Sequence, residues 1–232
     1  MIGWDGEHLT ARLGDARVLF TTRRGGVSEG PYASLNLGER TGDDPAAVAA
    51  NHERLRSLAG DVRIARCAQV HGSRVVVAVD GRPEADGVAT DVKGVAGLVI
   101  TADCLPVALS VPGAVAMLHA GWRGLAGGVL EQGVAALRRL GATGSVTAAI
   151  GPGAGGCCYE VGDEVRDAFA EVPEAMHGRN VDLKAVARAR LRAAGAVEVH
   201  DAGICTICDE RFFSHRRDRG VTGRQGGLAW LT

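Results

Sequence analysis

Two apolar segments joined by a Pro-Gly dipeptide constrain the fold of this chain more than any other feature. The stretch PVALSVPGAVAMLH (106–119) is interrupted only by Pro112-Gly113. Short, Val-rich segments on either side of such a pair are typical of two strands joined by a tight turn. A symmetric hairpin centred on that pair sets Pro106 opposite His119. This register decides which side chains share a face of the sheet.

Cys104 lies two residues before Pro106 and therefore projects from the same face as Pro106. Cys104 and His119 are then diagonal neighbours at the open end of the hairpin. Thiolate and imidazole are preferred zinc ligands, and a catalytic zinc has three protein ligands and one open position. His71, in the turn of CAQVHGSRVVV (67–77), is the candidate third ligand. The alternative for Cys104 is a buried cysteine that packs as a small hydrophobic residue.

The remaining patterns predict helices and short strands in mixed order. The segment DDPAAVAANHERLRSLAG (43–60) has acids before Pro45 and a final glycine, which are the signals of a helix. Several strands follow one another too closely for crossover helices. We therefore expect an α+β (mixed α/β) fold, a single domain over 1–232 with helices packed on a mixed β-sheet. Further helices are expected at 124–140, 160–170 and 182–194, and strands at 16–22, 63–70, 74–79, 95–100, 106–111, 114–119, 145–150, 197–200 and 227–231.

Charge and length exclude several classes of function. The net charge of −1 gives no basic surface for nucleic acid or acidic membranes. No segment approaches the roughly 20 apolar residues of a membrane helix. The start, MIGWDGEHLTARLGD, lacks the apolar core of a secretory signal, so we expect a cytoplasmic protein with reduced cysteines.

Two further motifs are weak. GPGAGG (151–156) fits GxGxxG but lacks the βαβ context and acidic residue of a dinucleotide site, so we interpret it as a turn. Cys205 and Cys208 form a CxxC pair. The adjacent Cys157 and Cys158 do not have the spacing of a second such pair, so packed or partly exposed thiols are the prediction.

Three polar residues, Arg23, Asn36 and Arg123, are candidates for substrate contacts, and Asp103 is a candidate catalytic residue. Arg23 lies in a glycine-rich loop, and its guanidinium fork suits phosphate. Asn36 would hydrogen-bond a ribose or base, or cap a turn. Arg123 would hold an anion, or a carboxylate that contacts one of the metal ligands. Asp103 would act as a catalytic acid/base or orient an imidazole; strand alternation turns it away from Cys104 and favours the orienting role.

Long compound motifs along the whole chain resemble one family. They are FTTRRGGVSEGPYASLNLGERTGDDPAAVAANHERL, QVHGSRV, TADCLPV, HAGWRG, GPGAGGCCYEVGDEV and FFSHRRDRGVTGR. The family is the polyphenol-oxidase/laccase-domain family, also described as purine nucleoside phosphorylases related to human FAMIN. The resemblance implies an α/β domain and a zinc site at His71, Cys104 and His119. It also places phosphate binding at Arg23.

The resemblance implies phosphorolysis of adenosine, inosine and methylthioadenosine, together with adenosine deamination. The partners would be purine nucleosides and phosphate, and the catalytic residues Cys104, His119 and Asp103. Family members linked to peptidoglycan editing suggest an alternative, a Cys/His or zinc-dependent amide hydrolase. Two further alternatives are a copper-dependent phenol oxidase, which would need more clustered histidines than the chain offers, and a zinc-stabilised binding module.

Overall fold

The predicted hairpin forms the centre of a six-stranded sheet in the computed structural model, which describes residues 1–60, 62–78 and 80–232. Pro106 pairs with His119, so the predicted register is confirmed. Most neighbouring strands are antiparallel, but the two edge pairs, β13 with β10 and β5 with β6, are parallel. Across this sheet the order is β13 (Ala196–Asp201), β10 (Val146–Ile150), β8 (Leu105–Val111), β9 (Ala114–Ala120), β6 (Gly87–Thr90) and β5 (Val75–Val77).

A second six-stranded sheet combines both ends of the chain. Its strand β14 lies between β3 and β7 and is antiparallel to both. The last strand thereby joins the N-terminal strands to the middle of the chain. The order is β1 (Gly3–Asp5), β2 (His8–Leu13), β3 (Ala16–Phe20), β14 (Gln225–Leu231), β7 (Val95–Thr101) and β4 (Arg63–Arg66).

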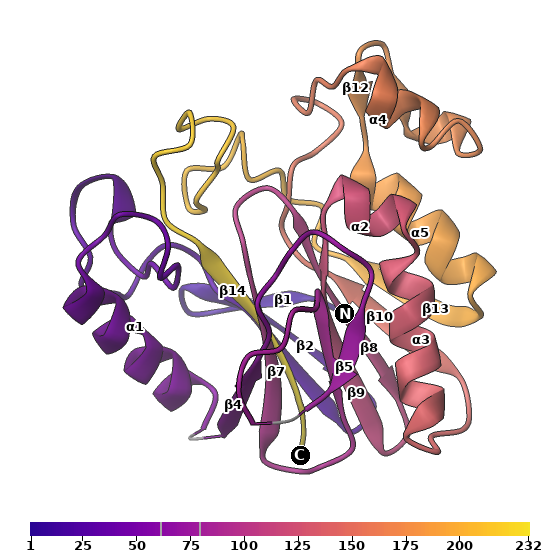
Figure 1. Ribbon diagram of the computed structural model, residues 1–232, viewed down its shortest axis with the longest axis horizontal. Coiled ribbons are helices and arrows are strands. Elements are labelled where there is room, and N and C mark those ends of the chain that lie inside the picture. The colour runs from indigo at the N-terminus through magenta and orange to yellow at the C-terminus, as the bar shows by residue number, and fades with distance from the viewer. Residues whose placement is uncertain (61, 79) are drawn as a thin grey trace.

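The two sheets pack face to face, and helices cover their outer faces (Figure 1). Phe20 and Val99 from one sheet meet Met117 and Ala149 from the other in a fully buried core. On the outer faces, α1 packs on the sheet that contains β14, and α3 and α5 pack on the hairpin sheet. The helices are α1 (Pro45–Leu58), α2 (Trp122–Ala126), α3 (Val129–Arg139), α4 (Asp163–Asp167) and α5 (Leu183–Ala193); β11 (Met176–His177) and β12 (Asn180–Val181) form a small separate ribbon.

Helix boundaries follow the local signals with two corrections. The side chain of Asp44 accepts a hydrogen bond from the N–H of Ala46, which caps α1 as its sequence predicts. The helix expected at 124–140 is divided into α2 and α3, because Gly128 adopts a left-handed conformation with a φ of 83°. The helix expected at 160–170 is shorter than predicted, because α4 covers only the five residues Asp163–Asp167.

The mixed α/β class is confirmed, although the strands form two mixed sheets where one was expected. The strand expected at 63–70 ends at Arg66, and the one expected at 74–79 is observed as β5, with residue 79 outside the described residues. Strands β1, β2, β6, β11 and β12 were not predicted. None of the helices in the described parts of the chain is long and apolar enough to cross a membrane.

Candidate metal centre and cavity

His71, Cys104 and His119 meet at the open end of the hairpin. Their potential ligand atoms all lie within 4.8 Å of one another. Cys104 directly precedes β8, and His119 lies near the end of β9, so the register of the hairpin brings them to one edge. His71 comes from the turn after β4 and has a φ of 60°, a left-handed conformation that aims its ring at His119. The structure therefore brings together the three residues predicted as ligands.

Asp86 orients this cluster. Its Oδ1 accepts a hydrogen bond from His119 Nδ1 at 2.8 Å, which leaves Nε2 of that imidazole available to a metal. The same carboxylate accepts backbone N–H groups from Val70, His71 and Gly72. One fully buried carboxylate thus fixes both the ring of His119 and the turn that carries His71.

The orienting role that the sequence suggested for Asp103 belongs to Asp86. Asp103 instead accepts hydrogen bonds from Thr206 Oγ1 at 2.7 Å and from the backbone N–H of Arg216 at 2.7 Å. Asp86 lies in the segment EADG (84–87), which was not among the motifs that predicted the site. Its proximity to His119 depends on β6, which pairs Gly87 with the residue before His119.

The cluster is charged around neutral pH in the absence of metal. Burial raises the pKa of the Cys104 thiol, but His119 and His71 oppose this and lower that pKa to about 6. Burial also opposes protonation of His119, but the Cys104 thiolate and Asp86 raise its pKa to about 9. The stabilisation from the depressed Cys104 pKa is lost as the pH falls through about 6. That from the raised His119 pKa is lost as the pH rises through about 9.

The donor set and the space around it fit a metal ion. One thiolate and two imidazoles form a three-ligand set of the kind that leaves a coordination position open. Gly121 keeps the neighbouring space free, because a Cβ there would lie 2.9 Å from Cys104 Sγ and 3.3 Å from the His71 ring. His119 is buried, Cys104 is partly buried and His71 is exposed.

The cluster opens into a cavity of about 650 Å³, within the size range of small-molecule sites. Glu39 forms ion pairs with Arg66 and Arg82 at one side of this cavity. Within the described parts of the chain, no ion pair engages the other arginines of the lining. The lining includes Gln69, Ile100, Trp122, Tyr159, His215, Arg40, Arg66, Arg82, Arg123, Arg216 and Arg224.

Of the three predicted substrate residues, Arg123 lines the cavity, and Arg23 and Asn36 do not. Asp103, predicted as a catalytic or orienting residue, also lines it. Arg23 donates from Nε to the carbonyl of Ala33 at 2.6 Å and lines a separate depression. Its loop folds back on itself there, away from the hairpin edge.

Asn36 is fully buried and organises a loop, which was the alternative left open for it. Its Oδ1 accepts the backbone N–H of Gly38 and that of Arg224, and its Nδ2 donates to Thr41 and Asp43. Asn36 therefore positions the backbone of Arg224, which lines the cavity. Sequence reasoning missed Arg224 and Arg216, although both stand in a motif that carried the resemblance.

The cysteines of both pairs are free and partly or fully exposed, as predicted, but the structure also brings the two pairs together. Cys157, Cys158, Cys205 and Cys208 form a second cluster, with sulfur atoms within 4.8 Å of one another. Spacing along the chain did not reveal it, because the two pairs meet only through the parallel pairing of β10 with β13. The glycine-rich turn between β10 and Cys157 leads the first pair to the second.

Fold and site define a four-layer α/β protein with a His–Cys cluster beside an arginine-rich cavity. Residues 17–232 match the family model described as multi-copper polyphenol oxidoreductase laccase, and the chain belongs to this family.

Relatives and a solved structure agree in length with this chain. It is 44% identical to a purine nucleoside phosphorylase of Streptomyces griseus, over 97% of this chain and 98% of the relative. It is also 44% identical to a purine nucleoside phosphorylase of Pseudomonas aeruginosa, over 93% of each chain. The crystal structure of a Neisseria meningitidis protein, 40% identical, superposes with a TM-score of 0.87 over 97% of this chain and 99% of the other.

Proposed function

We propose that this protein is a zinc-dependent purine nucleoside phosphorylase that acts on adenosine, inosine and methylthioadenosine. The observation that carries the proposal is the cavity, which places guanidinium and aromatic groups around His71, Cys104 and His119. The names of the relatives in Streptomyces griseus and Pseudomonas aeruginosa support the same activity.

The arginines of the cavity suit orthophosphate. Arg123 and Arg216 are exposed to the cavity, and their guanidinium groups lie over the rings of Trp122 and Tyr159, at 4.2 and 5.2 Å. Arg224 is held by the carbonyls of the chain that precedes β14 and by Asn36. Guanidinium groups with free N–H donors bind phosphate oxygens in a fixed geometry.

The reaction requires a bound phosphate beside the ribose. A phosphate oxygen attacks C1′ while the bond from C1′ to the base nitrogen breaks, and the base leaves with the bonding electrons and takes up a proton. The products are ribose 1-phosphate and the free purine. Trp122 and Tyr159 provide aromatic surface for the base. Burial raises the pKa of Tyr159 to about 12, so its hydroxyl keeps its proton and can donate a hydrogen bond.

His71, Cys104 and His119 would hold the zinc ion, with Asp86 orienting His119. Bound there, zinc would supply Lewis acidity to an oxygen of the substrate or of water. One thiolate and two imidazoles also occur in copper electron-transfer sites, which add a weak axial methionine. We propose zinc because thiolate and imidazole are its preferred ligands and a catalytic zinc has three protein ligands.

The proposal includes adenosine deamination, in which water replaces the amino group and ammonia leaves. The cavity offers the same surface to adenosine in both reactions. The decisive assay incubates the zinc-loaded protein with adenosine or inosine, with and without phosphate, and separates bases from nucleosides by chromatography. Phosphate-dependent release of base is the expected result. Conversion of adenosine to inosine without phosphate tests the deaminase activity, and no base release would refute phosphorolysis of these substrates.

Arg123→Ala is expected to raise the KM for phosphate about tenfold or more, because a charge-assisted hydrogen bond contributes about 1.5 kcal/mol or more. The KM for inosine should change less. Initial rates at varied phosphate concentration measure the effect. Arg23→Ala is the matched comparison, since the family resemblance points to that arginine. A rise confined to Arg23→Ala would move the phosphate site to the depression at Arg23.

A second candidate function is an amide hydrolase that uses Cys104 as nucleophile and His119 as base. The observation in its favour is the depressed pKa of Cys104, about 6, beside a protonated imidazole. It differs from the first candidate in requiring a free thiolate in the active protein.

Alkylation of Cys104 by iodoacetamide distinguishes the two candidates. In chelator-treated protein the rate should follow an apparent pKa of about 6, and in His119→Ala it should shift upward toward the ordinary 9.0, because the positive neighbour is lost. Zinc should protect Cys104. Peptide mass spectrometry reports this residue separately from the other cysteines. Rapid alkylation of the zinc-loaded wild type would favour the hydrolase.

A further inference from the structure

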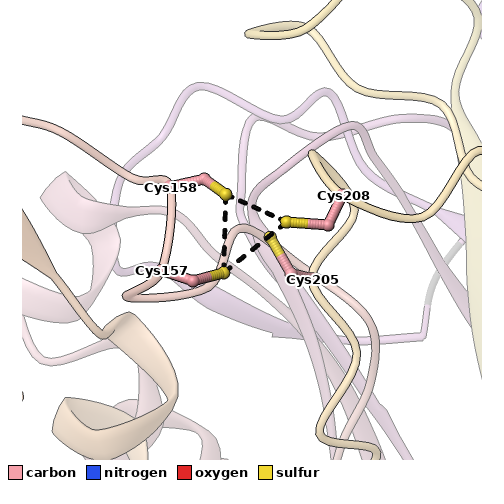
Figure 2. Close-up of side chains that lie close together, drawn as sticks. All are labelled: Cys157, Cys158, Cys205 and Cys208. Carbon is pink, nitrogen blue, oxygen red and sulfur yellow. Dashed lines mark hydrogen bonds between the residues drawn. The ribbon is translucent and has the colours of Figure 1, made fainter.

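The four-cysteine cluster stands outside the cavity and has no role in the proposed reaction. Its sulfur atoms converge from two loops (Figure 2). Cys158 Sγ lies 2.9 Å from Cys208 Sγ and 3.5 Å from Cys157 Sγ, and Cys157 Sγ lies 3.7 Å from Cys208 Sγ. All four are free thiols. Packing alone does not explain why four surface cysteines from two separate loops lie this close together.

The fold holds the two loops at this point. Strands β10 and β13 are parallel, so the segments that follow them leave the same edge of the sheet. Beyond the strands the pairing continues at Gly153 and Cys205, where the N–H of Thr206 donates to the carbonyl of Gly153 at 3.1 Å. Lys184 is buried, and its ammonium donates to the carbonyls of Gly153 and Ala154. This fixed positive charge lies behind the cluster.

The backbone around Cys205 favours a thiolate. The N–H of Gly155 donates to Cys205 Sγ at 3.2 Å. A Cβ at Gly155 would lie 3.3 Å from the sulfur atoms of both Cys157 and Cys205, so only glycine leaves the space between the two pairs free.

We propose that Cys157, Cys158, Cys205 and Cys208 bind a second zinc ion in a closed, structural site. Four thiolates are a complete tetrahedral ligand set for zinc, and a CxxC pair is a common source of two of them. Four uncompensated thiolates at this separation would repel one another. Zinc binding removes that repulsion and releases the thiol protons to solvent.

The site would fix one wall of the cavity. Thr206, inside the CxxC pair, donates to Asp103, the residue before Cys104. Tyr159, which lines the cavity, directly follows Cys158. Each of the two loops that carry the cysteines is therefore connected to the cavity, one through Thr206 and the other through Tyr159. This role differs from that of the first site, where three ligands leave a position open for chemistry.

Zinc stoichiometry of the full chain tests the proposal. Protein reconstituted with Zn²⁺ under reducing conditions and freed of excess metal should hold about two zinc ions per chain. The double variant Cys205→Ser with Cys208→Ser should hold about one, and His119→Ala should also hold about one. Cys67→Ser, which removes a buried thiol outside both clusters, should still hold about two.

Two further readouts follow the thiols themselves, and the first uses only the wild type. Zn²⁺ should protect all four cysteines of the wild type from N-ethylmaleimide, and a chelator should expose them together. Cd²⁺ in place of Zn²⁺ should give thiolate-to-cadmium charge-transfer absorption that persists in His119→Ala. A wild type with about one zinc, lost entirely in His119→Ala, would overturn the proposal. So would a disulfide within the cluster that survives in zinc-loaded protein, seen as an intact mass lower by two hydrogens.

Discussion

His119→Ala is expected to remove the metal from the cavity and to lower kcat/KM for phosphate-dependent base release about a thousandfold or more. His119 is one of the three proposed ligands. Metal ions contribute several kcal/mol to stabilising a transition state, and each 1.4 kcal/mol is about tenfold in rate. The loss should appear in kcat, with zinc content reduced in parallel. Inosine phosphorolysis and zinc analysis on the same preparation measure both.

The matched control is His200→Ala. His200 lies on β13, is partly exposed and has Glu198 3.2 Å away as an ion-pair partner. This variant should keep its zinc and its activity. Full activity of His119→Ala without zinc in the cavity would contradict a metal-dependent phosphorylase, and circular dichroism of both variants separates that result from misfolding.

Asp86→Asn should weaken zinc binding in the cavity about 10- to 100-fold, since it replaces the partner of a metal-binding imidazole. In the wild type, backbone N–H groups donate to both carboxylate oxygens of Asp86. In Asp86→Asn, one of these oxygens becomes an NH₂ group, which cannot accept them. The free energy of unfolding should therefore fall by about 3 kcal/mol, from the loss of satisfied hydrogen bonds in a buried site. Zinc titration with a competing chelator measures the first effect, and denaturant unfolding of the metal-free protein measures the second.

Glu84→Gln provides the same chemical change two residues earlier, on an exposed side chain. Glu84→Gln should change neither the zinc affinity nor the free energy of unfolding. If Asp86→Asn bound zinc as tightly as the wild type, the hydrogen bond to His119 would have no part in holding the metal. Equal stabilities of the two metal-free variants would show that the turn at His71 does not depend on Asp86.

The part of the site that the sequence predicted is local. Pro112-Gly113 sets the register of one hairpin, and that register places Cys104 beside His119 without knowledge of the remaining fold. His71 was a weaker prediction from the residues alone, because its loop reaches the hairpin through β6, a strand of four residues with no alternating pattern. The family resemblance supplied what local spacing did not.

The residues that were missed depend on contacts between distant segments. Asp86 reaches His119 only when β6 pairs with β9. The four cysteines meet only when β10 and β13 pair in parallel, and parallel pairing leaves no turn signal in a sequence. Phosphate binding by Arg23 stays a prediction, and the structure places this residue at a separate depression outside the cavity. A glycine-rich loop suggested a phosphate contact, but the loop closes on Ala33 and carries the guanidinium away from the cavity.

The place of β14 between β3 and β7 has a consequence for synthesis on the ribosome. Residues 225–231 are the last of the twelve strands of the two large sheets to be translated, yet they fill an interior position. Until they emerge from the exit tunnel, β3 and β7 each present an open edge able to pair with another nascent chain. That sheet can therefore close only after residues 225–231 have been made, and a chaperone that shields strand edges should increase the yield more than one that only accelerates helix formation.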